Sequence, residues 1–171
     1  MKKYLIKKGN HYATISIFER VAAFSWKNLV YRFQFRFHSD CYWSPARNQD
    51  DQDLNKITGI GFGINHHENS VRLAWVPDFN VPGSIKIYGY TYNGKEDDPR
   101  QTSLYITSVT TGQTCNAEIA SLGDKYKITI NGVIVSMDNS KPDHNLCFRL
   151  FPYFGGNNVA PQDMNIEIEY L

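Results

Sequence analysis

Alternation between apolar and polar positions is the strongest pattern along this chain. In the range Leu29–His38 every odd position is apolar or aromatic, and arginine, glutamine or histidine occupies every even position after Val30. A period of two places the two sets on opposite faces of a strand. The same pattern recurs in Lys125–Asn131, Val133–Met137 and Met164–Tyr170. These segments are predicted to be strands with one buried face.

Turn residues divide the rest of the chain into shorter candidate strands. Asn131-Gly132 joins two alternating runs and favours a two-residue hairpin, because both residues tolerate a positive φ. No segment carries a sustained apolar stripe at the helical period, so any helix should be short. The remaining candidate strands are His11–Ile17, Ile57–Ile64, Val71–Val76, Ser84–Asn93, Ser103–Val109, Thr114–Ile119 and Leu146–Tyr153. About ten or more strands without crossover helices predict an all-β fold, an antiparallel two-sheet jelly-roll sandwich, with residues 1–171 as one domain.

Charge and hydropathy argue against two classes of partner. The 171 residues include 18 basic and 17 acidic side chains, a net charge of +1, without the positive excess of a nucleic-acid-binding protein. We interpret Lys2, Lys3, Lys7 and Lys8 as a solvated terminus. No apolar run approaches the roughly 20 residues that cross a membrane. We therefore expect no nucleic-acid partner and no membrane insertion.

The N-terminus and the cysteines indicate the cellular compartment in which the protein is made. Only the three residues Tyr4–Ile6 separate two pairs of lysines, whereas a signal peptide needs an apolar run of about 7–15 residues. The odd number of cysteines and their scattered spacing favour reduced, buried thiols over disulfides or a zinc site. They are Cys41, Cys115 and Cys147. We predict a protein without a signal peptide that is cytoplasmic at synthesis.

A row of tyrosines marks one candidate binding surface. Tyr88, Tyr90 and Tyr92 share one face of the predicted strand Ser84–Asn93, about 7 Å apart along it. A tyrosine offers an aromatic ring face and a hydroxyl group, which together suit contact with a sugar ring. The alternative is a central strand that is buried on both faces.

The loop His66-His67-Glu68-Asn69 is a second candidate. Its imidazole and carboxylate groups could bind a metal ion or a polar ligand, and the structural alternative is an ordinary turn. Adjacent loop residues rarely converge on one ion, and the zinc pattern with histidines four apart is absent. We therefore expect no cofactor, with calcium at Pro161-Gln162-Asp163 as a minor alternative.

Glycines and glutamates leave further alternatives. Three glycines alternate with apolar residues along Ile57–Ile64. They either permit close approach by a ligand or another backbone, or make room for bulky tyrosines on a neighbouring strand. Glu167 and Glu169 share one face of the last predicted strand, as the paired carboxylates of retaining glycosidases do. We interpret the two glutamates as outward charges that protect an edge strand.

Enzyme signatures are weak in this sequence. Alginate-lyase-type sandwiches combine a tyrosine, a histidine, an arginine and a glutamine on one sheet, and this chain has those residue types without that family's local motifs. A nucleophile elbow, a phosphate loop and a dinucleotide fingerprint are also absent. The sequence thus favours a protein without catalytic residues over a polysaccharide lyase or a glycosidase.

Two segments carry a resemblance to a known group. Residues 65–72 read Asn-His-His-Glu-Asn-Ser-Val-Arg, and residues 150–157 read Leu-Phe-Pro-Tyr-Phe-Gly-Gly-Asn before Ala160-Pro161-Gln162-Asp163. In this order they resemble motifs of bacterial, largely Bacteroidetes, concanavalin-A-like jelly-roll domains, although Gln162 stands where that group has histidine. The resemblance covers about His11 to Leu171. It implies a jelly-roll fold and glycan recognition without an assigned activity.

The leading functional hypothesis from the sequence is a non-catalytic recognition or adhesion domain, lectin-like, with a glycan ligand. The alternative is a structural component of a bacteriophage virion, such as a capsid decoration or fibre protein, with other protein subunits as partners. The expected ligand contacts are Tyr88, Tyr90, Tyr92, Arg72, His66, His67 and Asn69, with Trp75 supporting the same face.

Overall fold

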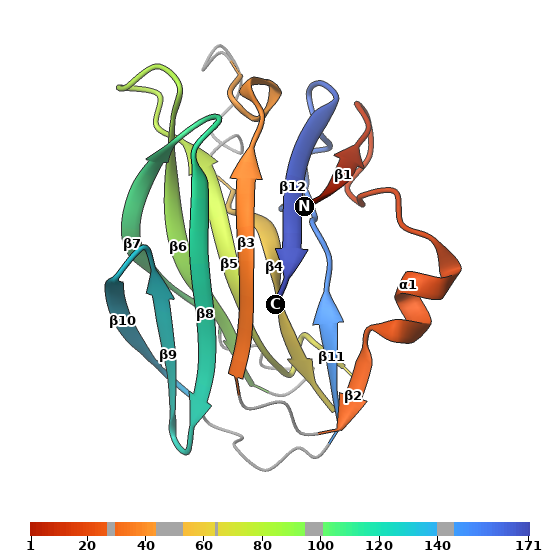
Figure 1. Cartoon of the computed structure of the whole chain (residues 1–171), viewed down its shortest axis with the longest axis vertical. Helices are drawn as coiled ribbons and strands as arrows, with labels where there is room; N and C mark the ends of the chain where they lie inside the picture. The colour runs from red at the N-terminus through yellow and green to blue at the C-terminus, as the bar shows by residue number, and fades with distance from the viewer. Residues whose placement is uncertain (27–29, 44–52, 64, 95–100, 140–145) are drawn as a thin grey trace.

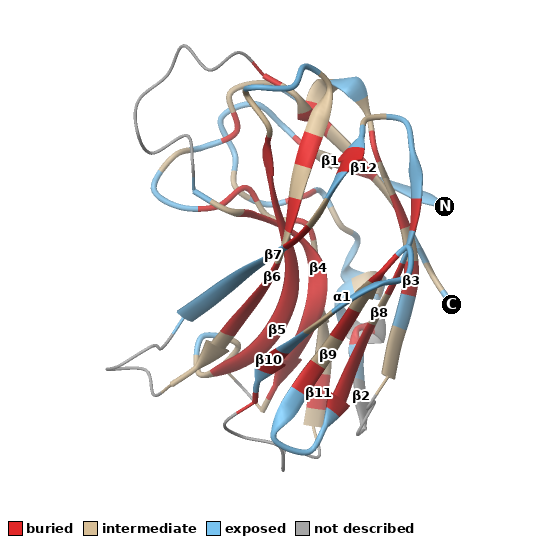
Figure 2. Ribbon diagram, turned by 90° about the vertical axis from the view of Figure 1, so that its left-hand side faces the viewer, coloured by how far each residue is buried: buried red, intermediate tan, exposed pale blue. Residues whose placement is uncertain are grey.

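The protein is a β-sandwich of two antiparallel sheets packed face to face (Figures 1 and 2). This computed structural model describes residues 1–26, 30–43, 53–63, 65–94, 101–139 and 146–171. The all-β jelly-roll prediction is confirmed. Leu29 and Ile64, at the ends of two predicted strands, lie outside the described residues.

Each sheet contains strands from both halves of the chain. Sheet A has the order β1 (Lys2–Ile6), β12 (Met164–Tyr170), β3 (Val30–Phe37), β8 (Thr114–Leu122), β9 (Lys125–Ile130) and β10 (Val133–Asp138). Sheet B has the order β2 (Phe24–Trp26), β11 (Leu146–Leu150), β4 (Asn55–Phe62), β5 (Asn69–Pro77), β6 (Ser84–Asn93) and β7 (Gln101–Thr110). A short helix, α1 (Ile17–Ala22), and a 3-10 turn, η1 (Ser39–Cys41), also occur.

The predicted hairpin is present between β9 and β10. Ile130 pairs with Val133, and the two residues between them, Asn131 and Gly132, have φ values of 48° and 88°. Positive φ at both positions is the geometry of a type I′ turn, which matches the right-handed twist of the flanking strands.

The N-terminal third differs from the prediction. His11–Ile17 is no strand, because only isolated bridges occur there before α1 begins at Ile17. At the terminus Lys2, Lys3, Lys7 and Lys8 are exposed, as interpreted from the sequence, but the segment also contributes a strand. Lys2–Ile6 forms β1 along β12, and burial of Tyr4 and Ile6 in the core stabilises this pairing.

The glutamates of β12 do not protect an edge. β12 lies between β1 and β3, so its backbone is paired on both sides. Glu167 instead accepts hydrogen bonds from Arg36 Nε at 3.0 Å and from His38 Nε2 at 2.9 Å. These bonds hold the pKa of Glu167 below its usual value.

The core lies between the sheets, where buried residues from both inner faces meet (Figure 2). Phe33, Phe35 and Phe37 of β3 are almost fully buried, and the Phe37 ring lies 4.9 Å from the Trp75 ring of β5. The three cysteines are buried thiols, and none of them forms a disulfide.

The glycines of β4 make room for side chains on the outer face of sheet B. A Cβ atom at Gly61 would lie 2.6 Å from the Phe148 ring, and one at Gly59 would lie 2.6 Å from the Arg72 Cα atom. Gly61 therefore makes room for a neighbouring side chain, a phenylalanine in place of the expected tyrosines. Gly59 allows another backbone to approach closely, since a Cβ atom there would lie 2.2 Å from the Val71 carbonyl oxygen.

We expect Gly61→Ala to lower the free energy of unfolding by about 1–3 kcal/mol, because the new methyl group overlaps the Phe148 ring. Urea unfolding measures this loss. In a Phe148→Leu background the same substitution should cost clearly less, since the smaller side chain leaves space. An equal cost in both backgrounds would show that the ring is not what the methyl group meets.

Candidate functional site: a basic groove on sheet B

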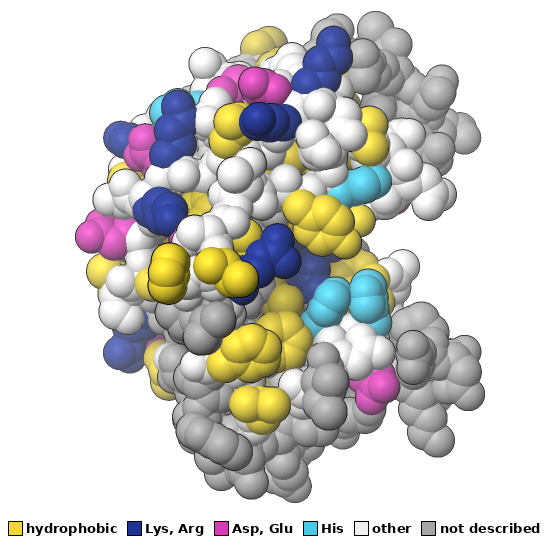
Figure 3. Space-filling view, turned by 90° about the vertical axis from the view of Figure 1, so that its right-hand side faces the viewer, with side chains coloured by type: hydrophobic (Ala, Val, Ile, Leu, Met, Phe, Trp, Pro, Cys, Tyr) yellow, Lys and Arg dark blue, Asp and Glu magenta, His cyan; other side chains and the backbone are white. Residues whose placement is uncertain are grey.

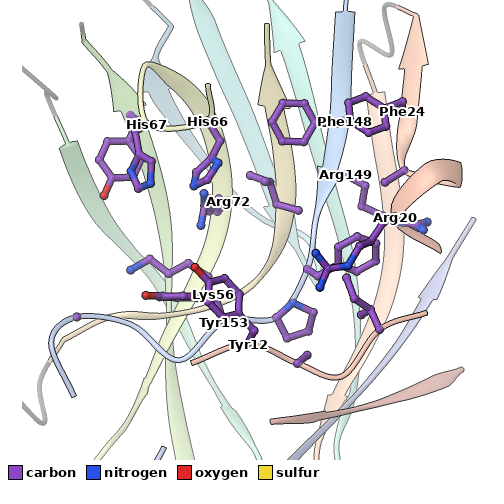
Figure 4. Close-up of a pocket in the computed structure, with 18 of the residues that line it drawn as sticks. Tyr12, Arg20, Phe24, Lys56, His66, His67, Arg72, Phe148, Arg149 and Tyr153 are labelled. Atoms are coloured by element: carbon purple, nitrogen blue, oxygen red, sulfur yellow. The ribbon is translucent and has the colours of Figure 1, made fainter. Parts of the chain in front are cut away.

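A groove crosses the face of sheet B that points away from sheet A (Figures 3 and 4). Its main cavity has a volume of about 660 Å³, and an adjoining cavity of about 370 Å³ shares Lys56, Tyr92 and Gly156 with it. We call the two cavities together the groove. The residues used below are Tyr12, Arg20, Phe24, Lys56, His66, His67, Arg72, Tyr92, Phe148, Arg149 and Tyr153 in the main cavity and Tyr90, Gln101 and Ser103 in the adjoining one.

Strand register brings these side chains into rows. Arg72 of β5 pairs with Gly59 on one side and with Tyr90 on the other, and Tyr90 pairs with Ser103. Paired residues of neighbouring strands point to the same face of a sheet. Arg72 and Tyr90 therefore share the groove face, whereas Leu73 and Trp75 point into the core.

Arg72 forms the floor of the groove. Only 6% of this residue is exposed, and its Nε and Nη2 atoms have no hydrogen-bond partner. Within the described residues it joins no ion pair. Burial lowers the pKa of Arg72 to about 10, against the opposing effect of tyrosine hydroxyl groups around it. A buried guanidinium with unused N–H donors is a receptor for an anion.

Lys56 is a second buried cation, on β4. Its Nζ atom donates a hydrogen bond to the Leu54 carbonyl at 2.6 Å and lies 4.6 Å from the centre of the Tyr90 ring. Burial, and then the charge of Arg72, lower the pKa of Lys56 to about 8. Lys56 is therefore mostly charged at neutral pH but is poised to lose its proton at mildly alkaline pH.

Tyr153 lies opposite Lys56 because their backbones form an isolated antiparallel bridge. The amide of each donates to the carbonyl of the other, at 2.8 and 3.0 Å. The close approach requires glycine nearby, since a Cβ atom at Gly155 would lie 2.9 Å from Lys56 Nζ. His11 stacks on the Tyr153 ring and Tyr12 contacts its edge. Burial raises the pKa of Tyr153.

Two histidines, His66 and His67, follow β4 and lie on the side of Arg72 opposite Tyr153. Figure 4 shows Arg72 between His66 and Tyr153. The rings of His66 and His67 are 4.1 Å apart, and His67 contacts the Tyr92 ring edge-on at 5.2 Å. Burial, and then the charges of Arg72 and His67, lower the pKa of His66 to about 4. His66 is therefore neutral at neutral pH and can accept a proton.

The adjoining cavity is lined by hydrogen-bonding groups. The Tyr90 hydroxyl group donates to Gln101 Oε1 at 2.6 Å and lies 3.2 Å from the Tyr92 hydroxyl group. Among the residues that the structure describes, no aspartate or glutamate lines the main cavity, and Asp53 is at the smaller one. The groove is therefore basic at its centre and polar at the β7 end.

Five of the eight residues predicted from the sequence line the groove. They are Arg72, His66, His67, Tyr90 and Tyr92. Tyr88 shares their face but packs against Tyr105 outside both cavities. The prediction was wrong for Asn69 and Trp75, which do not lie on the groove face. Both are fully buried in the inter-sheet core, where Asn69 accepts a hydrogen bond from Tyr126 and Trp75 packs on Phe37 and Trp43.

The sequence prediction missed several groove residues. Lys56 is a lone charge in the otherwise uncharged strand β4, which is a signal for a special environment. Tyr153 lies in the 150–157 motif, but the motif alone does not show that this tyrosine faces Arg72. Arg20 and Arg149 gave no sequence signal, because their proximity depends on how α1 and β11 pack.

No protein-family model and no curated protein sequence matches the chain. The solved structures that match include several of alginate lyases. Alginate lyase A1-II′ of polysaccharide lyase family 7 has a TM-score of 0.50 at 15% identity, over 85% of this chain and 63% of that one. Alginate lyase AlyC3 has a TM-score of 0.56 at 10% identity, over 83% and 64%. An alginate lyase from Alteromonas sp. 272 has a TM-score of 0.50 at 12% identity, over 83% and 70%.

These structures establish that the chain has their jelly-roll fold, and the chain spans less than two thirds of the length of the first two. They overturn our leading hypothesis from the sequence, a non-catalytic recognition domain, because the neighbours are enzymes of polysaccharide cleavage. A virion role and virion partners find no support in them. The sequence reasoning erred because an aromatic, polar sheet face is common to sugar-binding and sugar-cleaving sandwiches.

Two further expectations concern metals and membranes. Within the described residues no group of three or more His, Cys, Asp and Glu side chains is arranged to hold a metal ion. Asp163 accepts a hydrogen bond from the Lys8 amide at 2.8 Å, and calcium at this position stays a prediction. No described helix is long and apolar enough to cross a membrane.

We expect Lys56→Met to raise the free energy of unfolding at pH 7 by up to about 3 kcal/mol, because a buried ammonium disfavours the folded state. The folded protein releases this proton near pH 8, whereas the unfolded chain holds it up to the ordinary value of 10.5. The free energy of unfolding of the wild type therefore rises between about pH 8 and pH 10.5. The difference in free energy of unfolding between Lys56→Met and the wild type should shrink over the same range. Urea unfolding at about pH 7 and pH 9.5 tests this, and a pH-independent difference would contradict it.

Proposed function

We propose that this chain is a polysaccharide lyase that cleaves a uronate-containing polysaccharide by β-elimination. The observation that carries the proposal is the buried guanidinium of Arg72, whose Nε and Nη2 atoms have no hydrogen-bond partner. It lies at the floor of a groove, and no acidic residue is among the described residues that line the main cavity. The fold neighbours support it, since alginate is a polymer of uronates.

The first requirement of this reaction is neutralisation of the uronate carboxylate. The proton to be removed is on C5, next to that carboxylate, and it is weakly acidic because its loss places a second negative charge on the group. Arg72 and Lys56 would bind the carboxylate with charge-assisted hydrogen bonds. Such bonds are stronger at the buried floor of a groove than in bulk water, and they stabilise the charge that develops in the transition state.

The second requirement is an acid and a base on the two sides of the sugar. His66 is neutral at neutral pH and would accept the C5 proton. Tyr153 holds its proton, since burial raises its pKa, and would donate it to the leaving glycosidic oxygen. The two residues flank Arg72 (Figure 4), which agrees with a sugar held between them.

The bonds balance without any further reactant. The C5–H bond breaks, its electron pair forms the C4–C5 double bond, and the bond from C4 to the glycosidic oxygen breaks. That oxygen takes the Tyr153 proton, and the proton held by His66 returns to Tyr153 through solvent. The products are a shorter chain with a new reducing end and a chain that begins with an unsaturated uronate.

We expect Arg72→Gln to lower kcat/KM on polyuronates by about 100-fold or more, because the developing carboxylate charge loses its partner. The ultraviolet absorbance of the unsaturated product measures the rate. Because the substitution removes a buried, unpaired charge, the variant should unfold at a temperature no lower than wild type.

The matched control is Arg32→Gln on the outer face of sheet A, which loses an exposed ion pair with Glu118 and should retain full activity. Full activity of Arg72→Gln, or wild-type protein that yields no unsaturated product from any polyuronate, would overturn the proposed function.

The pH dependence of kcat/KM is a separate prediction. Activity should persist down to about pH 5, because His66 gains a proton only near pH 4, and it should fall above about pH 8, where Lys56 loses its charge. In Lys56→Arg the alkaline decline should disappear, since a guanidinium stays charged there. An acid limb near the ordinary histidine value of about 6.5 would exclude His66 as the base.

A further inference from the structure

β7 is an edge strand that lacks the usual protection against pairing with another strand. It ends sheet B beyond β6, at the left of Figure 1. Its ten residues, Gln101–Thr110, include no charged residue and no proline. Edge strands of natural proteins are usually short, charged or interrupted by proline, because an open edge pairs readily with another strand. β7 is therefore a candidate interaction surface.

The other end strands of the two sheets do carry such protection. β1 has Lys2 and Lys3 among its five residues, and β2 is only three residues long. β10 has six residues and ends with Asp138, which forms an ion pair with Lys125. Of the described end strands, β7 is thus the longest, and neither charge nor shortness protects it.

The first half of β7 is exposed on both of its faces. Each residue of Gln101–Tyr105 is exposed, and Figure 2 draws much of this strand in pale blue. Leu104 pairs with Gly89 and so points toward sheet A, yet it is 42% exposed. Tyr105 on the opposite face is 50% exposed and contacts the Tyr88 ring edge-on at 5.6 Å. The pairing with β6 shifts register only after Tyr105, so this half of the strand is regular.

The neighbouring edge of sheet A adds apolar surface on the same side of the sandwich. The Asn93 side-chain amide, at the end of β6, donates a hydrogen bond to the Asp138 carbonyl of β10 at 2.7 Å. This bond joins the two sheets beside β7. Val133 and Ile134 of β10 are both exposed. The side of the molecule that β7 and β10 form therefore combines an open backbone edge with exposed apolar side chains.

We propose that two copies of this chain form a symmetric dimer by antiparallel pairing of their β7 edges. A twofold axis is the commonest symmetry of protein dimers and brings the same strand of each copy together. Because β7 has no charge, no like charges meet at the shared edge. Its threonine, serine and tyrosine side chains form favourable pairs across strands.

The size of this edge fits a stable dimer. A strand of ten residues is about 34 Å long, and two packed sheets with their outer side chains are about 20 Å thick. Pairing along β7 therefore covers roughly 700 Å² of each copy, close to the value of about 800 Å² that is typical of a stable interface.

The dimer joins the two copies of sheet B into one continuous sheet. Opposite residues of antiparallel strands point to the same face, so both grooves open on one side of that sheet. Gln101 and Ser103 line the smaller cavity of the groove, which therefore adjoins the same cavity of the second copy. The dimer itself does not depend on the proposed lyase activity.

Light scattering after size-exclusion chromatography, repeated over a wide range of concentrations, tests the dimer. The wild type should reach the mass of two chains. Tyr105→Lys places one positive charge of each copy at the shared edge and should raise the dissociation constant about tenfold or more, and Leu104→Lys should do the same. The matched control is Phe18→Lys, an equally drastic change at an exposed residue of α1, on the opposite side of Figure 1. It should leave the dissociation constant unchanged.

Amide hydrogen exchange gives a second measurement that needs no variant. Exchange in residues 101–110 should slow as the protein concentration rises, because pairing protects the open edge, whereas exchange in β1 should not change. A wild type that stays monomeric at every concentration overturns the dimer. So do equal effects of Tyr105→Lys and Phe18→Lys, or protection that appears in β1 and not in β7.

Discussion

The burial of two positive charges, Arg72 and Lys56, on the outer face of sheet B is the constraint on which the candidate site depends. Arg72 and Lys56 are largely removed from water, and in the described part of the chain neither forms an ion pair with an acidic side chain. Their lowered pKa values express the cost of that burial, which the charge of Asp53 offsets in part for Lys56. The rest of the sandwich must offset this cost through its aromatic and aliphatic core. The buried cations of the groove therefore lower the stability of the folded protein, and the same cations favour the binding of an anion.

Backbone contacts between distant segments complete the site. The bridge between Lys56 and Tyr153 joins strand β4 to a segment almost a hundred residues later, and Gly155 permits that approach. His66 arrives from the connection between β4 and β5. The proposed acid, base and cation thus come from three stretches of chain, and backbone pairing fixes two of them, Lys56 and Tyr153, relative to each other.

The same sandwich architecture accommodates both recognition and catalysis, so a proposed lyase must also show the groups that its reaction needs. The distinguishing feature here is chemical. A surface that only binds a sugar needs aromatic rings and hydrogen-bonding groups, which this groove has along β6 and β7. A neutral histidine and a protonated tyrosine on either side of a buried guanidinium add the groups that proton transfer requires.

The sequence by itself determined the strands of the second half of the chain, the Asn131-Gly132 hairpin and the all-β class, because these depend on local alternation and turn chemistry. The sequence did not decide which side chains of β5 point into the groove and which point into the core. Every residue of Asn69–Pro77 is buried, so alternation carries no contrast, and Asn69 and Trp75 were assigned to the wrong side. Only the tertiary structure brought Lys56 and Tyr153 to Arg72, since those contacts arise from long-range packing that no local pattern records.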